Sequence, residues 1–112
     1  MITIEVYRNP QGAIIGFCSR GHAGDAPAGK SVICAWVSAV TQMVLVGLEQ
    51  QLHYSVAYKT DTKQGLLQVT LQQEPDGQSQ ALFGSMEMTL KQLAAQCPQD
   101  VRLYEHGGET NV

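Results

Sequence analysis

The segment Val32–Gln51 is the most apolar part of this 112-residue chain, and it is long enough for a helix of about five turns. Its apolar side chains cover more than the single stripe of an ordinary surface helix. Such a helix is either central in the fold or covered on a second side by a partner subunit. Because Ser38, Thr41 and Gln42 interrupt the apolar run from Val32 to Val46, we expect it to be too short to span a bilayer.

The rest of the chain alternates between strand-like segments and turn residues. Met1–Arg8 places Ile2, Ile4 and Val6 on one side and polar residues on the other, which is typical of a half-buried strand. The turn residues Asn9–Gly12 then lead to a second strand and predict a hairpin. The remaining expected elements are strands at Ala13–Ser19, Tyr54–Thr60, Gly65–Gln73 and Asp100–Tyr104, a helix at Gln78–Cys97, and a frayed tail at Glu105–Val112.

This order, ββαββαβ, predicts an α+β fold of one domain over residues 1–112. We expect a two-layer sandwich, with both helices on one face of a mainly antiparallel mixed sheet. Apolar residues make up 44% of the chain, so a core can form without disulfides or a metal.

Charge and cysteine content narrow the classes of partner and compartment. The net charge is −3 and the basic residues are scattered, which argues against direct binding of nucleic acid. The chain starts with a strand-like segment, so we expect no signal peptide, no membrane attachment and a cytoplasmic location. Cys18, Cys34 and Cys97 are odd in number and widely spaced, which indicates reduced thiols. No metal and no cofactor is expected.

The stretch Gly21–Ser38, GHAGDAPAGKSVICAWVS, combines a possible base, a possible nucleophile and a flexible loop. Ser31 suits the N-cap of the helix, with its hydroxyl accepting from the backbone N–H of Cys34. That places Cys34 in the first helical turn, where backbone N–H groups and the helix dipole favour a thiolate. His22, in the loop before it, could take the thiol proton. Alternatively, Cys34 packs as a small apolar residue and His22 is a surface histidine.

The same stretch contains a rival motif, because Gly24–Ser31 matches the phosphate-binding pattern GxxxxGK[ST], with Lys30 as its lysine. The surroundings argue against a nucleotide site. Folds that use this loop need a parallel sheet with a helix between its strands, whereas hairpins flank it here. A module that binds a peptide or nucleotide through this loop without cutting it is the alternative function.

The residues GHAG at 21–24, a short glycine-containing spacer, and V-I-C-A-x-V-S at 32–38 resemble the signature of the ribosomal-processing cysteine protease (Prp) family. The similarity extends to the length, the MITIEVYR start and the apolar helix. It implies a homodimeric cytoplasmic endopeptidase that removes a short N-terminal extension from a large-subunit ribosomal protein, cutting after an aromatic residue. Carried over by position, Cys34 is the nucleophile and His22 the general base.

The resemblance also implies supporting residues. Ser38 matches the serine that ends the motif, and Gly21, Ala23, Gly24 and Gly29 form the expected substrate loop. The family usually has aspartate where this chain has Ser31, and serine cannot supply a charge to orient the histidine. Asp25 could stand in for it. A further alternative is an inactive homologue, disabled at Ser31, that only binds the ribosomal protein or its partner subunit. We expect the glycine-rich segment Gly21–Lys30 to be mobile until substrate orders it.

Overall fold

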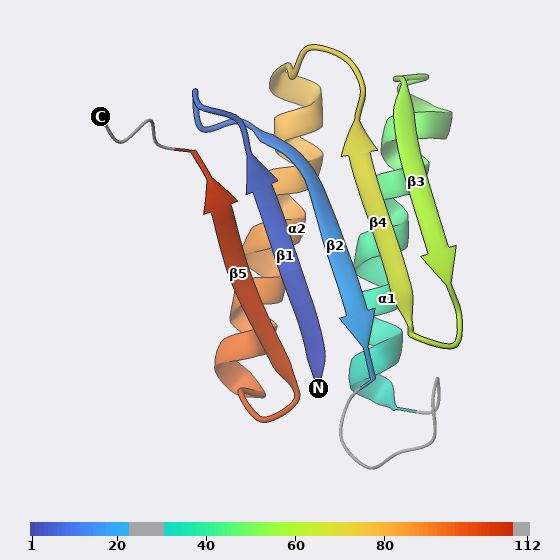
Figure 1. Cartoon of the computed structure of the whole chain (residues 1–112), viewed down its shortest axis with the longest axis vertical. Helices are drawn as coiled ribbons and strands as arrows, with labels where there is room; N and C mark the ends of the chain where they lie inside the picture. The colour runs from blue at the N-terminus through green and yellow to red at the C-terminus, as the bar shows by residue number, and fades with distance from the viewer. Residues whose placement is uncertain (23–30, 109–112) are drawn as a thin grey trace.

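The computed structural model describes residues 1–22 and 31–108. The order ββαββαβ predicted from the sequence is confirmed, with one π-helical turn added after the first helix (Figure 1). The elements are β1 (Ile2–Arg8), β2 (Ile14–Gly21), α1 (Val32–Val46), η1 (Gly47–Gln51), β3 (Val56–Asp61), β4 (Leu66–Leu71), α2 (Gly77–Gln96) and β5 (Val101–Gly107).

The strands form one mixed sheet in the order β3-β4-β2-β1-β5. The neighbours β3–β4, β4–β2 and β2–β1 are antiparallel, and only the edge strand β5 runs parallel to its neighbour β1. Figure 1 shows α1 and α2 side by side on one face of the sheet. The expected α+β sandwich, with two helices on one face of a mainly antiparallel mixed sheet, is therefore confirmed.

The core lies between the helices and the sheet, and its residues follow the strand and helix periods. Ile2, Ile4 and Val6 of β1 are all buried, as the alternation predicts. Phe17 of β2 meets Phe83 of α2 edge to face, with ring centroids 6.3 Å apart. From the first helix, Val37, Val44 and Leu48 enter the core.

The helix predicted over Val32–Gln51 is confirmed as α1 followed directly by η1. Through η1 the helical segment Val32–Gln51 reaches 20 residues with a mean hydropathy of 1.7, so by length and composition alone it could cross a membrane. The expectation that it is too short was wrong on length, because the helix continues through Gly47. One side of it packs against the sheet.

The last strand also extends further than expected. Glu105–Gly107, which the sequence places in a frayed tail, pairs with Val6–Arg8 and continues β5. The glycine and charged residues there carry no strand signal of their own. The pairing with the long strand β1, together with ion pairs from Glu105 to Arg8 and Lys91, holds this segment in the sheet.

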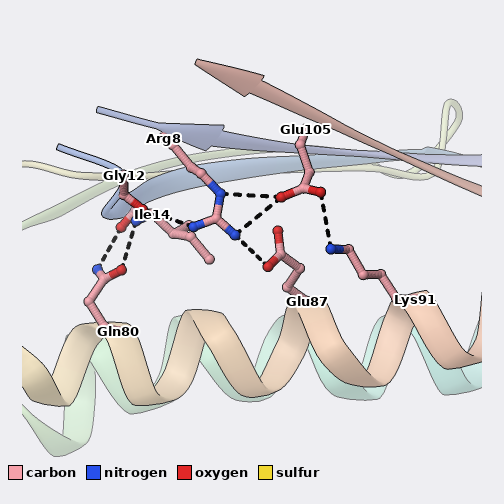
Figure 2. Close-up of polar contacts among 7 residues, drawn as sticks. All are labelled: Arg8, Gly12, Ile14, Gln80, Glu87, Lys91 and Glu105. Carbon is pink, nitrogen blue, oxygen red and sulfur yellow. Dashed lines mark hydrogen bonds and ion pairs between the residues drawn. The ribbon is translucent and has the colours of Figure 1, made fainter. Parts of the chain in front are cut away.

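Polar side chains attach α2 to the sheet (Figure 2). The Gln80 amide accepts from Ile14 N at 2.7 Å and donates to Ile14 O at 2.8 Å. Arg8 bonds the Gly12 carbonyl at 2.9 Å and pairs with the buried Glu87 carboxylate at 2.5 Å. These contacts fix the helix relative to β1, β2 and β5.

The Glu105 ion pairs give stability a defined pH dependence. The hydrogen bond from Lys91 lowers the pKa of Glu105 below its ordinary 4.5, with Arg8 acting in the same direction. A lowered folded-state pKa stabilises the fold above the unfolded value, and this contribution is lost as the pH falls through the folded value. We expect Lys91→Met to lower the Tm at pH 7, and the difference from the parent protein to shrink from about pH 5 downwards. A difference in Tm that stays constant down to pH 3 would contradict this.

Candidate active site

Three segments that are distant in the sequence meet at one end of the molecule: the end of β2, the start of α1 and the β3–β4 turn (Figure 1). Between them lies a hollow of about 80 Å³. His22 from the end of β2 and Cys34 from α1 both line it, together with Ser38. The structure thus brings the predicted base and the predicted nucleophile to the same hollow.

Cys34 is positioned by the helix start. The Ser31 hydroxyl accepts from the backbone N–H groups of Ile33 at 3.1 Å and Cys34 at 3.3 Å, so the predicted N-cap is confirmed. The Cys34 side chain is partly buried and lies in the first turn. The amide groups and aligned peptide dipoles of a first turn favour negative charge, which suits a thiolate nucleophile.

The cap predicts how substitutions of Ser31 change stability. Ser31→Ala removes the acceptor for two backbone N–H groups and should lower the free energy of unfolding by about 1 kcal/mol. Ser31→Asp keeps an acceptor at the same place and should stay within about 0.5 kcal/mol of the parent. Urea unfolding followed by circular dichroism measures both, and equal stability of the two variants would contradict the cap.

His22 is held by the β3–β4 turn. The backbone N–H of Gly21 donates to the Gln64 carbonyl at 2.9 Å, and the His22 Nε2 lies 3.4 Å from the Lys63 carbonyl. The Met1 ammonium also donates to the His22 carbonyl. A neutral imidazole that donates from Nε2 keeps its lone pair on Nδ1, so the Lys63 carbonyl favours the tautomer with a basic Nδ1.

Gly65, at the end of that turn, is a positioning residue that the sequence did not single out. Its φ is +60°, and a Cβ there would lie 2.6 Å from the Gly21 carbonyl oxygen and 2.9 Å from the His22 Cε1. Only glycine allows the turn to approach this closely. The sequence signals a turn at 61–65, but nothing in it says that the turn packs on the histidine.

The other predicted site residues fall into two groups. Ser31 is occupied as the helix cap, and Ser38 lines the hollow one turn beyond Cys34. The remaining predicted residues, Asp25 and the loop residues Ala23, Gly24 and Gly29, lie outside the described residues. The expected mobility of the loop falls on the same segment and stays a prediction.

The two remaining cysteines lie away from this hollow. The Cys18 thiol is 3.9 Å from Arg20 Nη1, on the side of β2 opposite Phe17 and the helices, so it does not join Cys34 and His22 in a metal site. Cys97, at the end of α2, packs against the core.

The profile of the cysteine protease Prp family matches residues 1–102, nearly the whole chain. The chain belongs to the cysteine protease Prp family. It is therefore a cysteine protease, and the family predicted from the GHAG and V-I-C-A-x-V-S motifs is confirmed. No curated protein matches the chain at a significant level.

Solved structures show the same fold. SMU.848 from Streptococcus mutans is 24% identical, with a TM-score of 0.83 over 96% of this chain and 95% of that one. The essential ribosomal processing protease Prp from S. aureus, in complex with a covalently linked product peptide, is 20% identical with a TM-score of 0.85, over 94% of this chain and 99% of that one. The same protease in complex with a substrate peptide has a TM-score of 0.82 at 19% identity, over the same shares of each chain.

The nucleotide-binding alternative is not favoured. The strand before the Gly24–Ser31 motif is β2, and both of its neighbours in the sheet, β1 and β4, run antiparallel to it. A phosphate-binding loop of the GxxxxGK[ST] type belongs to a parallel sheet. The described residue of the motif that would bind Mg²⁺, Ser31, is instead the cap of α1.

Proposed function

We propose that this protease removes an N-terminal extension from a large-subunit ribosomal protein, with Cys34 as nucleophile and His22 as general base. The observation that carries the assignment is that both side chains line one hollow in a member of a cysteine protease family. The S. aureus relative, a ribosomal processing protease with peptide complexes, supports the substrate class.

The chemistry follows from the placement of these groups. His22 takes the thiol proton, and the Cys34 sulfur attacks the scissile carbonyl carbon to give a tetrahedral intermediate. The imidazolium then protonates the leaving amine, and the C–N bond breaks to leave an acyl-enzyme. Water, deprotonated by His22, releases the carboxylate product and restores the thiol. Ser38 lies where its hydroxyl could bind the thiolate or the substrate.

The β3–β4 turn supplies an acceptor for the histidine ring, but not the negative charge of the family's usual aspartate. Ser31 carries no charge and is bonded to the helix N–H groups. The Lys63 carbonyl, beside Nε2, is the acceptor that orients the imidazole in this chain. The loop residues Gly21, Ala23, Gly24 and Gly29 are proposed to bind the substrate peptide, with Asp25 as a supporting residue.

The test uses the ribosomal protein precursor of the same organism, read by intact mass spectrometry. We expect the parent protein to remove a short N-terminal segment and His22→Ala to remove it at least about 10²-fold more slowly. Binding of the precursor without any cleavage by the parent protein would show an inactive homologue and overturn the proposal. Binding of ATP–Mg²⁺ that is lost in Lys30→Ala would favour the rival module.

We also propose that the protease works in the cytoplasm as a homodimer, without nucleic acid or membrane as partner. An apolar stripe at helical spacing lies exposed along α1: Val32 is 80% exposed, Trp36 44%, Met43 55% and Val46 47%. A second copy covering this stripe would bury it, as isologous dimers do.

Charge placed in the stripe should separate the subunits. Met43→Lys should give a monomer by light scattering at micromolar concentration, because dimerisation would bury an unpaired ammonium group. Met88→Lys is the matched control, since Met88 is 65% exposed on α2, outside the stripe, and this variant should remain a dimer. A parent protein that is already monomeric would remove the dimer hypothesis.

A further inference from the structure

Ser19 of β2 is a polar residue in an apolar part of the sheet. It pairs with Ile4 of β1 on one side and with Leu67 of β4 on the other, and all three are buried. Because side chains alternate along a strand, Ser19 faces the same way as Phe17, toward the helices. Ser19 itself is 6% exposed. Among the residues that the structure describes, none forms a hydrogen bond with its hydroxyl.

A hydroxyl in such a place loses bonds to water, and this costs free energy unless a partner replaces them. Ser19 lines the hollow of about 80 Å³ that Cys34 and His22 also line, so a molecule that enters the hollow can supply the partner. In peptide cleavage the scissile carbonyl has to enter it, because the carbonyl carbon must reach the Cys34 sulfur. The carbonyl oxygen is then an acceptor for a hydroxyl in the hollow.

Several backbone N–H groups around the hollow are already bonded within the protein. The N–H of Cys34 donates to the Ser31 hydroxyl at 3.3 Å. Those of Gly21 and Gly65 donate to carbonyls of the β3–β4 turn, at 2.9 and 3.3 Å. An N–H group that is bonded in this way is not free to stabilise a substrate oxygen. The nucleophile's own amide therefore does not serve as the donor that many acyl-transfer enzymes place there.

Side-chain hydroxyls supply the remaining donors. Among the described residues that line the hollow, Ser19 and Ser38 carry hydroxyl groups, and each can donate one hydrogen bond. Ser38 is exposed, so water competes for its hydroxyl. Ser19 is buried, and a fixed donor in a site that excludes water stabilises developing charge more strongly. Of the two, Ser19 is the better placed to stabilise an oxyanion.

We infer that Ser19 is a catalytic residue whose hydroxyl donates a hydrogen bond to the scissile carbonyl oxygen as that oxygen becomes negative. When the Cys34 sulfur bonds to the carbonyl carbon, the π electron pair of the C=O bond moves to the oxygen. The Ser19 O–H bond stays intact. The pair returns when the C–N bond breaks and the His22 imidazolium protonates the amine. The inference rests on the proposed function, since it requires a peptide to be cut at Cys34.

Ser19→Ala tests the hydroxyl, with a quenched fluorescent peptide that spans the cleavage junction of the precursor. We expect kcat to fall about 10²-fold and KM to stay within about twofold, because the bond strengthens in the transition state. The Tm should equal or exceed that of the parent protein, because no bond of the free protein is lost. The pH profile of Cys34 alkylation should not change, since the donor acts on the substrate oxygen. Ser19→Thr, which keeps a hydroxyl, should recover about tenfold or more of the lost kcat.

Ser79→Ala is the matched control, because Ser79 is also a buried serine but its hydroxyl bonds the Asp76 backbone at the cap of α2. It should show the opposite pattern, with a lower Tm and a kcat within about twofold of the parent. If the parent protein cuts the peptide and Ser19→Ala keeps its kcat, lowers the Tm or shifts the alkylation profile, the role of Ser19 is overturned while the proposed function stands. Failure of the parent protein to cut the peptide or the precursor would overturn the proposed function, and the role of Ser19 with it.

Discussion

Cys34→Ala should abolish processing of the ribosomal protein precursor while leaving the fold intact. Without the thiol no acyl-enzyme forms, and we expect the rate of precursor cleavage to fall by at least about 10³-fold. The Cys34 side chain is only partly buried, so its replacement by a methyl group should cost about 1 kcal/mol or less. Cleavage is measured by intact mass spectrometry and stability by urea unfolding.

Cys97→Ala is the matched control for this substitution. Cys97 is also partly buried and packs against the core, but it lies at the end of α2 and does not line the hollow. It should lose similar stability and keep cleavage within about twofold of the parent. Equal cleavage by the two variants would exclude Cys34 as the nucleophile.

Gly65→Ala should lower kcat/KM by about 10²-fold although residue 65 carries no reactive group. A methyl group there meets the Gly21 carbonyl oxygen and the His22 ring, and a catalytic group displaced by about 1 Å costs a factor of this size. The positive φ adds strain of about 1–2 kcal/mol, which lowers the free energy of unfolding. Peptide kinetics and urea unfolding separate the two effects.

Gly12→Ala is the control that isolates the strain. Gly12 has a φ of +88°, and a Cβ there would meet nothing within 4 Å. Gly12→Ala should lose only the stability that the positive φ costs, about 1–2 kcal/mol, and retain nearly all its activity, because it leaves His22 in place. If Gly12→Ala loses as much activity as Gly65→Ala, the effect comes from general destabilisation and not from the position of the histidine.

Most of the fold could be predicted from the sequence, because local patterns indicate most of its strands, helices and turns. The alternation in Met1–Arg8 and Gly65–Gln73 and the turn residues at Asn9–Gly12 each agree with the final structure. The continuation of β5 to Gly107 could not be predicted, because it depends on pairing with β1 and on ion pairs to distant residues. The helical span Val32–Gln51 was predicted, but the sequence did not show that its last turn, Gly47–Gln51, is π-helical.

The candidate site also has features that local sequence predicts and features that depend on tertiary contacts. The motifs locate Cys34 and His22, and the N-cap at Ser31 follows from a local preference that the structure confirms. The contribution of the β3–β4 turn could not be predicted. Lys63 and Gly65 lie against the histidine, and Gln64 bonds Gly21, because β4 lies beside β2 in the sheet.

The most direct measurement of the Cys34–His22 pair is alkylation of all three cysteines as a function of pH, in the parent protein and in His22→Ala. Mass spectrometry resolves the modified peptides of Cys18, Cys34 and Cys97. We expect Cys34 in the parent protein to react well below pH 8, and faster than the other two thiols, with that advantage lost in His22→Ala. Equal reactivity of the three thiols in both proteins would contradict a preformed thiol–imidazole pair.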